Sequence, residues 1–247
     1  MLLAVDIGNT NISCAIFKGT CVLASWEIAL KDYSRFILSK KILHKNIDAA
    51  LIASVVPEFS RRLIKDIYKL SKIKALLIAK DIRLPIKTVY HQPKELGSDR
   101  LVNAYAASKI YKTPVIIISC GTAITIDAVS INNIHLGGFI MPGLKLCLTA
   151  LNLATAQLPA ITLKPPNGLL GKDTKSSILN GVIFGTSASI SGLIKNISSK
   201  MKGKITLIGT GGDIRLIKKL SPEIKIIDPM LTLKGIALIY ANKKTNR

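Results

Sequence analysis

Residues 1–11, MLLAVDIGNTN, predict a buried strand that ends in a tight polar turn. The apolar run Leu2 to Val5 comes directly before Asp6, and Gly8 then lets the backbone approach a ligand without a Cβ in the way. Asn9 to Asn11 supply side-chain donors, and the turn directs backbone N–H groups outward, as a phosphate-binding loop requires. A strand-like stretch follows, so the turn forms the tip of a hairpin. The alternative is an ordinary hairpin turn, because Asn and Gly favour turns in any case.

A second copy of this pattern begins just over one hundred residues later. Val115 to Ser119 is again an apolar strand, followed by Gly121-Thr122, a further strand-like stretch and Asp127. Two phosphate-facing hairpins, one in each half, resemble the superfamily of actin, sugar kinases and heat-shock ATPases. The resemblance implies an α/β fold of two ribonuclease-H-like halves, each a mixed five-stranded sheet flanked by helices. Thr113-Pro114 marks the boundary, which gives an N-terminal half over 1–112 and a C-terminal half over 113–247.

Hydrophobic periodicity predicts the remaining elements. In the first half we expect strands at Cys21 to Ile28, Ala49 to Val55 and Ala75 to Ala79, and helices over Asp32 to Lys45, from Pro57 onward and over Leu101 to Tyr111. In the second half we expect helices over Leu144 to Ala154, Thr174 to Lys200 (interrupted near Gly192) and Leu231 to Ala241, and strands at Ile205 to Ile208 and Ile224 to Ile227. The segment between Ile161 and Asp173 has the length of a binding or lid loop.

The composition is that of a globular protein with a sizeable core, since 49% of the 247 residues are apolar and 20% are charged. No apolar run approaches the length that spans a bilayer, and Asp6 interrupts the N-terminal apolar stretch. We therefore expect no membrane partner and no signal peptide. The four cysteines show no C-x-x-C spacing, which favours reduced thiols in a cytoplasmic protein.

A formal net charge of +21 would suit a nucleic-acid partner. However, the lysines and arginines are spread along the whole chain, and aromatic residues make up only 5% of it. We interpret the charge as compositional drift at solvated positions and expect no nucleic-acid partner.

Six motifs, in this order and spacing, resemble those of type III pantothenate kinases. They are DIGNTN (Asp6 to Asn11), GSDR (Gly97 to Arg100), GTAITID (Gly121 to Asp127), GGFIMPG (Gly137 to Gly143), TAQLP (Thr155 to Pro159) and GKDT (Gly171 to Thr174). The resemblance implies an ATP-dependent kinase that phosphorylates pantothenate to 4'-phosphopantothenate, the first step of coenzyme A biosynthesis. It also implies a homodimer, with pantothenate bound near the interface.

The resemblance assigns roles to particular residues. Asp99 would be the catalytic base, and Asp6 would hold Mg²⁺ through water. The ATP-binding residues would be Asp6, Ile7, Gly8, Asn9, Thr10, Asn11, Ile12, Ser13 and Thr122. The pantothenate-binding residues would be Tyr90, Gly97, Ser98, Asp99, Arg100 and Thr174. Asp127, at the end of the second hairpin, is a further candidate for a metal- or phosphate-linked carboxylate. On local pattern alone, Ser98 or Asp99 could instead cap the helix that follows.

The chain departs from the family pattern at two positions. Members commonly carry Asp two residues before the second Gly-Thr, where it binds an activating K⁺ or NH₄⁺ ion, and this chain has Ser119 there. A hydroxyl contributes no formal charge, so we expect weak or absent potassium dependence unless a nearby group substitutes. The family also often has a basic residue at the position of Ser13, for which Lys18 could substitute.

Two other functions fit parts of the pattern. The first is a sugar or acetate kinase, or a polyphosphate-type phosphatase, of the same superfamily; the GSDR segment and the short chain argue against it. The second is a non-catalytic transcriptional accessory or regulatory protein on the same fold, which the altered ion position and the positive charge favour. The retention of Asp6, Asp99 and Asp127 among only 14 acidic residues argues for the enzyme.

Overall fold

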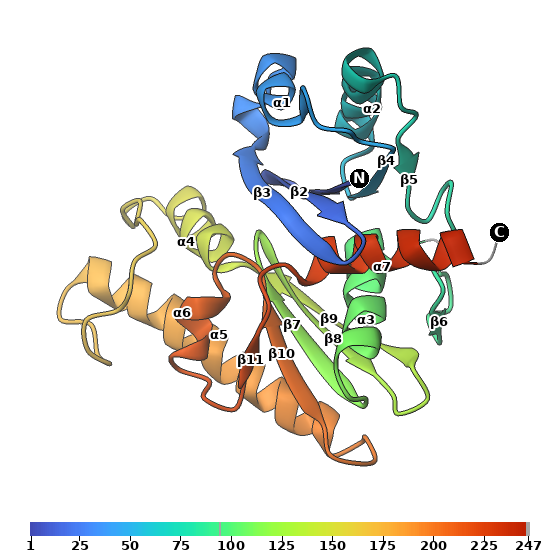
Figure 1. The fold of residues 1–247 in the computed structure, drawn as a ribbon. Helices are drawn as coiled ribbons and strands as arrows, with labels where there is room; N and C mark the ends of the chain where they lie inside the picture. The colour runs from blue at the N-terminus through green and yellow to red at the C-terminus, as the bar shows by residue number, and fades with distance from the viewer. Residues whose placement is uncertain (94, 246–247) are drawn as a thin grey trace. The chain divides into compact units, whose positions relative to one another are not determined.

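The computed structural model describes residues 1–93 and 95–245, and it divides into two compact units. The first contains residues 1–110 together with the chain from residue 230 onward, and the second contains residues 111–229. Each unit is a mixed sheet flanked by helices (Figure 1), as the sequence predicts.

The sheet of the first unit has the order β3-β2-β1-β4-β5. Its strands are β1 (Leu2–Ile7), β2 (Asn11–Lys18), β3 (Cys21–Ala29), β4 (Ala49–Ser54) and β5 (Leu76–Leu77). The first three strands form an antiparallel meander, whereas β4 pairs in parallel with β1, and β5 with β4. This is the predicted five-stranded mixed sheet.

Helices cover both faces of this sheet, because alternate residues of β1 point to opposite sides. Leu2 and Ala4 belong to a first core cluster with the helices α3 (Ser98–Ile110) and α7 (Leu231–Thr245). Leu3 and Val5 belong to a second core cluster with α1 (Arg35–Ile42) and α2 (Pro57–Ser71). Figure 1 shows α1 and α2 together on one side of the sheet. The short elements η1 (Leu30–Asp32) and β6 (Lys87–Thr88) lie in the connections.

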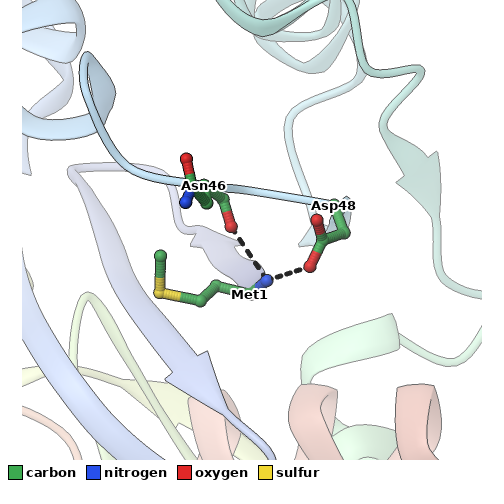
Figure 2. A network of polar contacts seen from close by, with 3 residues as sticks. All are labelled: Met1, Asn46 and Asp48. Carbon is green, nitrogen blue, oxygen red and sulfur yellow. Dashed lines mark hydrogen bonds and ion pairs between the residues drawn. The ribbon is translucent and has the colours of Figure 1, made fainter.

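The start of β1 is tied to the segment before β4. The α-amino group of Met1 donates a hydrogen bond to the Asn46 carbonyl oxygen at 2.9 Å and forms an ion pair with the Asp48 carboxylate (Figure 2). These contacts support the parallel pairing that begins at Leu2 and Ala49.

The last helix differs from the predicted division of the chain. The sequence boundary at residue 113 places it in the second half, but Leu233, Ile236 and Ile239 of α7 lie in the first core cluster. A hydrogen bond of 2.8 Å from the Thr232 hydroxyl to the Asn103 side-chain oxygen joins α7 to α3. The apolar stripe of α7 predicts a buried helix, but it does not say against which sheet the helix packs.

The second unit repeats the topology of the first, with the order β11-β10-β7-β8-β9. Its strands are β7 (Val115–Cys120), β8 (Ala123–Val129), β9 (Ile134–Pro142), β10 (Thr206–Thr210) and β11 (Ile226–Ile227). Its helices are α4 (Leu144–Leu153), α5 (Thr174–Ser198) and α6 (Ile214–Lys218). They pack on one face of the sheet in a third core cluster that includes Ile116, Ile124 and Ile183.

Helix α5 runs without a break through Gly192, contrary to the predicted interruption. Ile190 and Ile194, on either side, are buried in the third core cluster, and this packing outweighs the roughly 1 kcal/mol that a helical glycine costs. By length and composition α5 could also cross a membrane, but 44% of its apolar window is buried inside the unit. It is therefore read as a core helix.

Candidate functional site

The first hairpin is shaped by a short backbone contact. The N–H of Gly8 donates to the Asn11 carbonyl oxygen at 2.9 Å, and a Cβ on Gly8 would lie 3.4 Å from the same oxygen. Asn9 and Thr10 at the tip are exposed. Ile7 and Ile12 are fully buried in the second core cluster, and the Ile7 carbonyl oxygen accepts from the Val55 N–H at 3.1 Å.

A row of three polar residues crosses the sheet beside this hairpin. Asp6 of β1 lies opposite Ser13 of β2, and Ser13 lies opposite Glu27 of β3. Directly opposed residues project to the same face, and here it is the face that α3 and α7 cover. Glu27 accepts hydrogen bonds from the Asn11 side-chain amide at 2.5 Å and from the Ser13 hydroxyl at 3.4 Å.

The carboxyl group of Asp6 is strongly perturbed. Burial, followed by the negative charges of Asp99 and Glu27, raises the pKa of Asp6 to about 7. Each of these causes disfavours the ionised form of Asp6. Asp99 and Glu27 add negative charge near the hairpin. Such a carboxylate is a suitable partner for a hard cation bound through water.

Helix α3 begins beside the end of β4. The Ser98 hydroxyl donates to the Ser54 carbonyl oxygen at 3.2 Å and accepts from the Ser54 N–H at 3.1 Å. Ser54 is the register partner of Ile7, so this pair fixes the first turn of α3 at the hairpin end of the sheet. A Cβ on Gly97 would lie 2.5 Å from the Asp99 Oδ1, which shows that the Asp99 carboxylate folds back over the glycine.

The arrangement of donors fits Mg²⁺ held mainly by a nucleotide. Among the residues that the structure describes, no three His, Cys, Asp or Glu side chains gather closely enough to form a metal site of their own. Mg²⁺ commonly keeps several waters and binds through one or two carboxylates plus substrate phosphates. The negative charge around Asp6 and the outward turn at Gly8 suit that mode of binding.

Two further residues of the first unit, Arg100 and Tyr90, are predicted to bind pantothenate. Arg100, in the first turn of α3, is 4% exposed. Tyr90 is half-buried and packs against the first core cluster.

Lys18 cannot substitute for a basic residue at the position of Ser13. It ends β2 five residues from Ser13, which corresponds to about 17 Å along an extended strand, away from the turn.

The second hairpin has a comparable backbone framework. Thr122 is exposed at its tip, and its carbonyl oxygen accepts from the Gly143 N–H at 3.0 Å. A Cβ on Gly143 would lie 2.2 Å from the Gly121 oxygen, so only glycine permits this approach. Gly211, with φ of +88°, packs equally closely against Cys120, where a Cβ would lie 2.3 Å from the carbonyl oxygen. The hairpin tip, the start of α4 and the glycine-rich loop therefore adjoin.

Ser119 occupies in β7 the place that Asp6 occupies in β1. Each is the fifth residue of a six-residue strand and is half-buried. Asp127 lies towards the end of the second strand of this hairpin, opposite Ile117 and away from the turn. It is 2% exposed, and its Oδ1 lies 2.8 Å from Nε2 of the buried His135.

Thr174 is exposed at the first position of α5. Asp173 caps this helix: its carboxylate accepts from the Ser176 N–H at 2.8 Å, while the Ser176 hydroxyl lies within hydrogen-bond distance of the Asp173 N–H. The bonds from Ser176 lower the pKa of Asp173. The GKDT motif thus forms the helix start, and Thr174 lies where the 161–173 loop ends.

The family model of type III pantothenate kinase matches residues 2–196. The chain belongs to the type III pantothenate kinase family. A relative from Finegoldia magna that bears this name is 38% identical, and the match covers 97% of this chain and 96% of the relative. The resemblance drawn from the motifs is confirmed, and with it the prediction that the chain is a kinase.

Solved structures confirm the fold. A structure named as a Baf family transcriptional activator from Campylobacter jejuni has a TM-score of 0.64 at 22% identity, over 98% of this chain and 99% of that one. An activator of 2-hydroxyisocaproyl-CoA dehydratase from Clostridium difficile, with bound ADPNP, has a TM-score of 0.58 at 14% identity, over 99% and 96%. At these identities the likeness concerns architecture alone.

The structure of this pantothenate kinase family member brings some predicted residues together and adds two. Asp6, Ser13, Ser98 and Asp99 meet at one end of the first sheet. Glu27 was missed, because its place beside Ser13 depends on strand register. His135 was missed for the same reason: it lies opposite Val129, next to a shift in the β8-β9 register. The alternation of strand residues was the signal that could have found both.

Proposed function

We propose that this chain transfers the γ-phosphoryl group of ATP to the terminal hydroxyl of pantothenate, which yields 4'-phosphopantothenate in the first step of coenzyme A biosynthesis. The observation that carries the proposal is the Ser98–Ser54 contact, which holds Asp99 within electrostatic reach of Asp6 at the phosphate-type hairpin. Membership of the kinase family supports the same reaction.

In this proposal Asp99 is the catalytic base. Phosphoryl transfer needs positioning and charge neutralisation more than covalent help from the protein. Asp99 would accept a hydrogen bond from the attacking hydroxyl and take its proton as the new P–O bond forms. Gly97, Ser98, Arg100 and Tyr90 would line the pantothenate site. Arg100 offers fixed planar donors for the carboxylate or amide of the substrate.

The proposed nucleotide-binding residues lie on the two hairpins. They are residues 6 to 13 of the first unit, which would contact the phosphates, and Thr122 of the second unit. When bound, Mg²⁺ supplies charge neutralisation at the transferring group. Asp6 would hold that ion through water. Thr174 would contact pantothenate from the start of α5.

Two features of the family remain proposals for this chain. A monovalent cation would have only the Ser119 hydroxyl at the position where an Asp is common, so we propose weak potassium dependence. Asp127 is bonded to His135, and we propose for it a structural role in preference to metal binding.

A homodimer is also part of the proposal. The second unit exposes large apolar side chains on β9, α4 and the 161–173 loop: Leu136, Phe139, Ile140, Leu146, Leu151, Leu153, Leu169 and Leu170. Apolar exposure of this extent on one unit is typical of a protein–protein contact. A C₂ pair is the commonest arrangement of soluble oligomers.

A coupled ADP-release assay with ATP, Mg²⁺ and pantothenate, run with and without K⁺, tests the proposal. We expect pantothenate-dependent turnover, and we expect Asp99→Asn to fold normally but to lose at least about 100-fold in turnover. The matched control is Glu58→Gln, which also removes one negative charge but lies on α2. Near-wild-type turnover of Asp99→Asn would remove Asp99 from the role of base. No turnover of the folded wild type under either condition would favour a regulatory protein instead.

A further inference from the structure

Glu27 places a negative charge beside a hairpin that is proposed to bind phosphates. Its carboxylate accepts from Asn11 at 2.5 Å and from Ser13 at 3.4 Å, and both of these residues belong to the first hairpin. The register of β2 with β3 places Glu27 directly opposite Ser13, so the sheet fixes the position of this residue beside the hairpin, and its carboxylate is exposed there. Among the residues that the structure describes, no Lys or Arg forms an ion pair with it.

An anionic side chain is an unexpected neighbour for a triphosphate. Glu27 is one of only 14 acidic residues against 35 Lys and Arg, so the general drift of the sequence does not account for a carboxylate at this place. Its charge lies close to the site, because Glu27 is opposite Ser13 in the sheet and Ser13 is opposite Asp6. Metal-free ATP carries more negative charge than its magnesium complex, so the same carboxylate repels the free nucleotide more strongly.

We propose that Glu27 is a specificity-determining residue that makes the first hairpin select magnesium-bound ATP over metal-free ATP. It does so in two ways: it holds the side chains of Asn11 and Ser13 in place, and it supplies a charge that repels metal-free ATP more strongly than the magnesium complex. The proposal rests on the proposed function only in that the first hairpin must bind nucleotide.

Two variants of Glu27 separate its charge from its hydrogen bonds. Glu27→Gln keeps a side-chain oxygen that can accept from Asn11 and removes the charge. Glu27→Ala removes both. The matched control is Glu58→Gln, which changes the net charge equally but lies on α2, whose core contacts are on the opposite face of the sheet. Its carboxylate pairs with Arg61 at 3.8 Å.

The experiment is an isothermal titration of the full chain with ATP, once with excess Mg²⁺ and once with EDTA. For Glu27→Gln we expect metal-free ATP to bind about three- to tenfold more tightly and Mg-ATP to change by less than about twofold. The preference for Mg-ATP therefore falls. For Glu27→Ala we expect Mg-ATP to bind more weakly as well, because Asn11 and Ser13 lose their common acceptor.

Each outcome decides between distinct conclusions. An unchanged preference in Glu27→Gln, equal to that of Glu58→Gln, overturns the proposal while leaving the nucleotide site in place. A wild type that binds neither form of ATP overturns the proposed function itself, and the selective role of Glu27 with it. Because the readout is binding, neither conclusion depends on catalytic turnover.

Discussion

The substitution Asp6→Asn tests the electrostatics of the first hairpin through protein stability. Folding raises the pKa of Asp6 from 3.8 to about 7, so the folded protein binds a proton that the unfolded chain has already lost. Below pH 4 the Asp6 carboxyl is protonated in both the folded and the unfolded state, so it does not lower the free energy of unfolding. Between pH 4 and 7 Asp6 lowers the free energy of unfolding by about 1.4 kcal/mol for each pH unit, and above pH 7 this loss is constant.

The full difference of about three pH units corresponds to an upper value of about 4 kcal/mol. Asparagine has a similar shape and no charge. We therefore expect Asp6→Asn to be up to about 4 kcal/mol more stable than the wild type at pH 8, and nearly equal to it at pH 4. The gain in stability should accompany a loss of turnover, because the same carboxylate is proposed to hold Mg²⁺ through water.

Trp26 makes the measurement specific to this sheet. It is the single tryptophan of the chain and lies in β3, next to Glu27. Urea unfolding followed by its fluorescence, without Mg²⁺ or nucleotide, gives the free energy of unfolding of both proteins from pH 4.5 to 8. A difference between variant and wild type that stays constant over this range would refute the reasoning.

The charged neighbours of Asp6 provide the internal control. Asp99 and, to a smaller extent, Glu27 raise the pKa of Asp6. Removing either charge by Asp99→Asn or Glu27→Gln should therefore reduce the gain produced by Asp6→Asn, and Asp99→Asn should reduce it more. Equal gains in all backgrounds would show that burial alone perturbs Asp6.

Three further predictions concern other parts of the molecule. In the kinase assay, replacing K⁺ by Na⁺ should change turnover by less than about twofold, and Ser119→Asp should introduce a clear potassium requirement; strong activation abolished by Ser119→Ala would contradict this. Gly235→Ala should lower the free energy of unfolding by about 1–3 kcal/mol, because the new Cβ would lie 2.7 Å from Val102 Cγ1 and 2.8 Å from the Val102 oxygen, whereas Gly181→Ala meets nothing within 4 Å and should be neutral or stabilising in the same urea titration. Sedimentation at micromolar concentration should show a dimer that Leu170→Asp weakens, and a wild-type monomer would exclude the proposed pair.

The hairpins and helix starts that depend on local sequence pattern were largely predictable. Apolar runs that end in Gly, Asn or Thr mark the two hairpins, and Pro57 marks the start of α2 within the predicted periodicity. These features depend on residues close together in the chain, where propensity and hydrophobic period act directly. The family motifs added the order of the two halves.

Partner choice over long sequence separation was not predictable in the same way. The apolar residues of α7 do not by themselves select one of the two sheets. The helix packs on the first sheet, where Gly235 fits closely against Val102, and this fit depends on three-dimensional shape. The place of Glu27 depends on the β2-β3 register, which a shift between Ile16 and Phe17 alters along the strand. A one-residue error in register would turn Glu27 to the opposite face.

The two hairpins share a backbone plan but differ in charge. At the penultimate position of the first strand of each unit, β1 carries the carboxylate of Asp6 and β7 carries the hydroxyl of Ser119. The first hairpin adds Asp99 and Glu27 within electrostatic reach, whereas the carboxylate of Asp127 in the second unit lies away from the turn and is bonded to His135. We therefore propose that the first unit contributes most of the negative charge that stabilises a cation accompanying the triphosphate. This asymmetry is why we assign both the magnesium requirement and the selection against free ATP to the first hairpin.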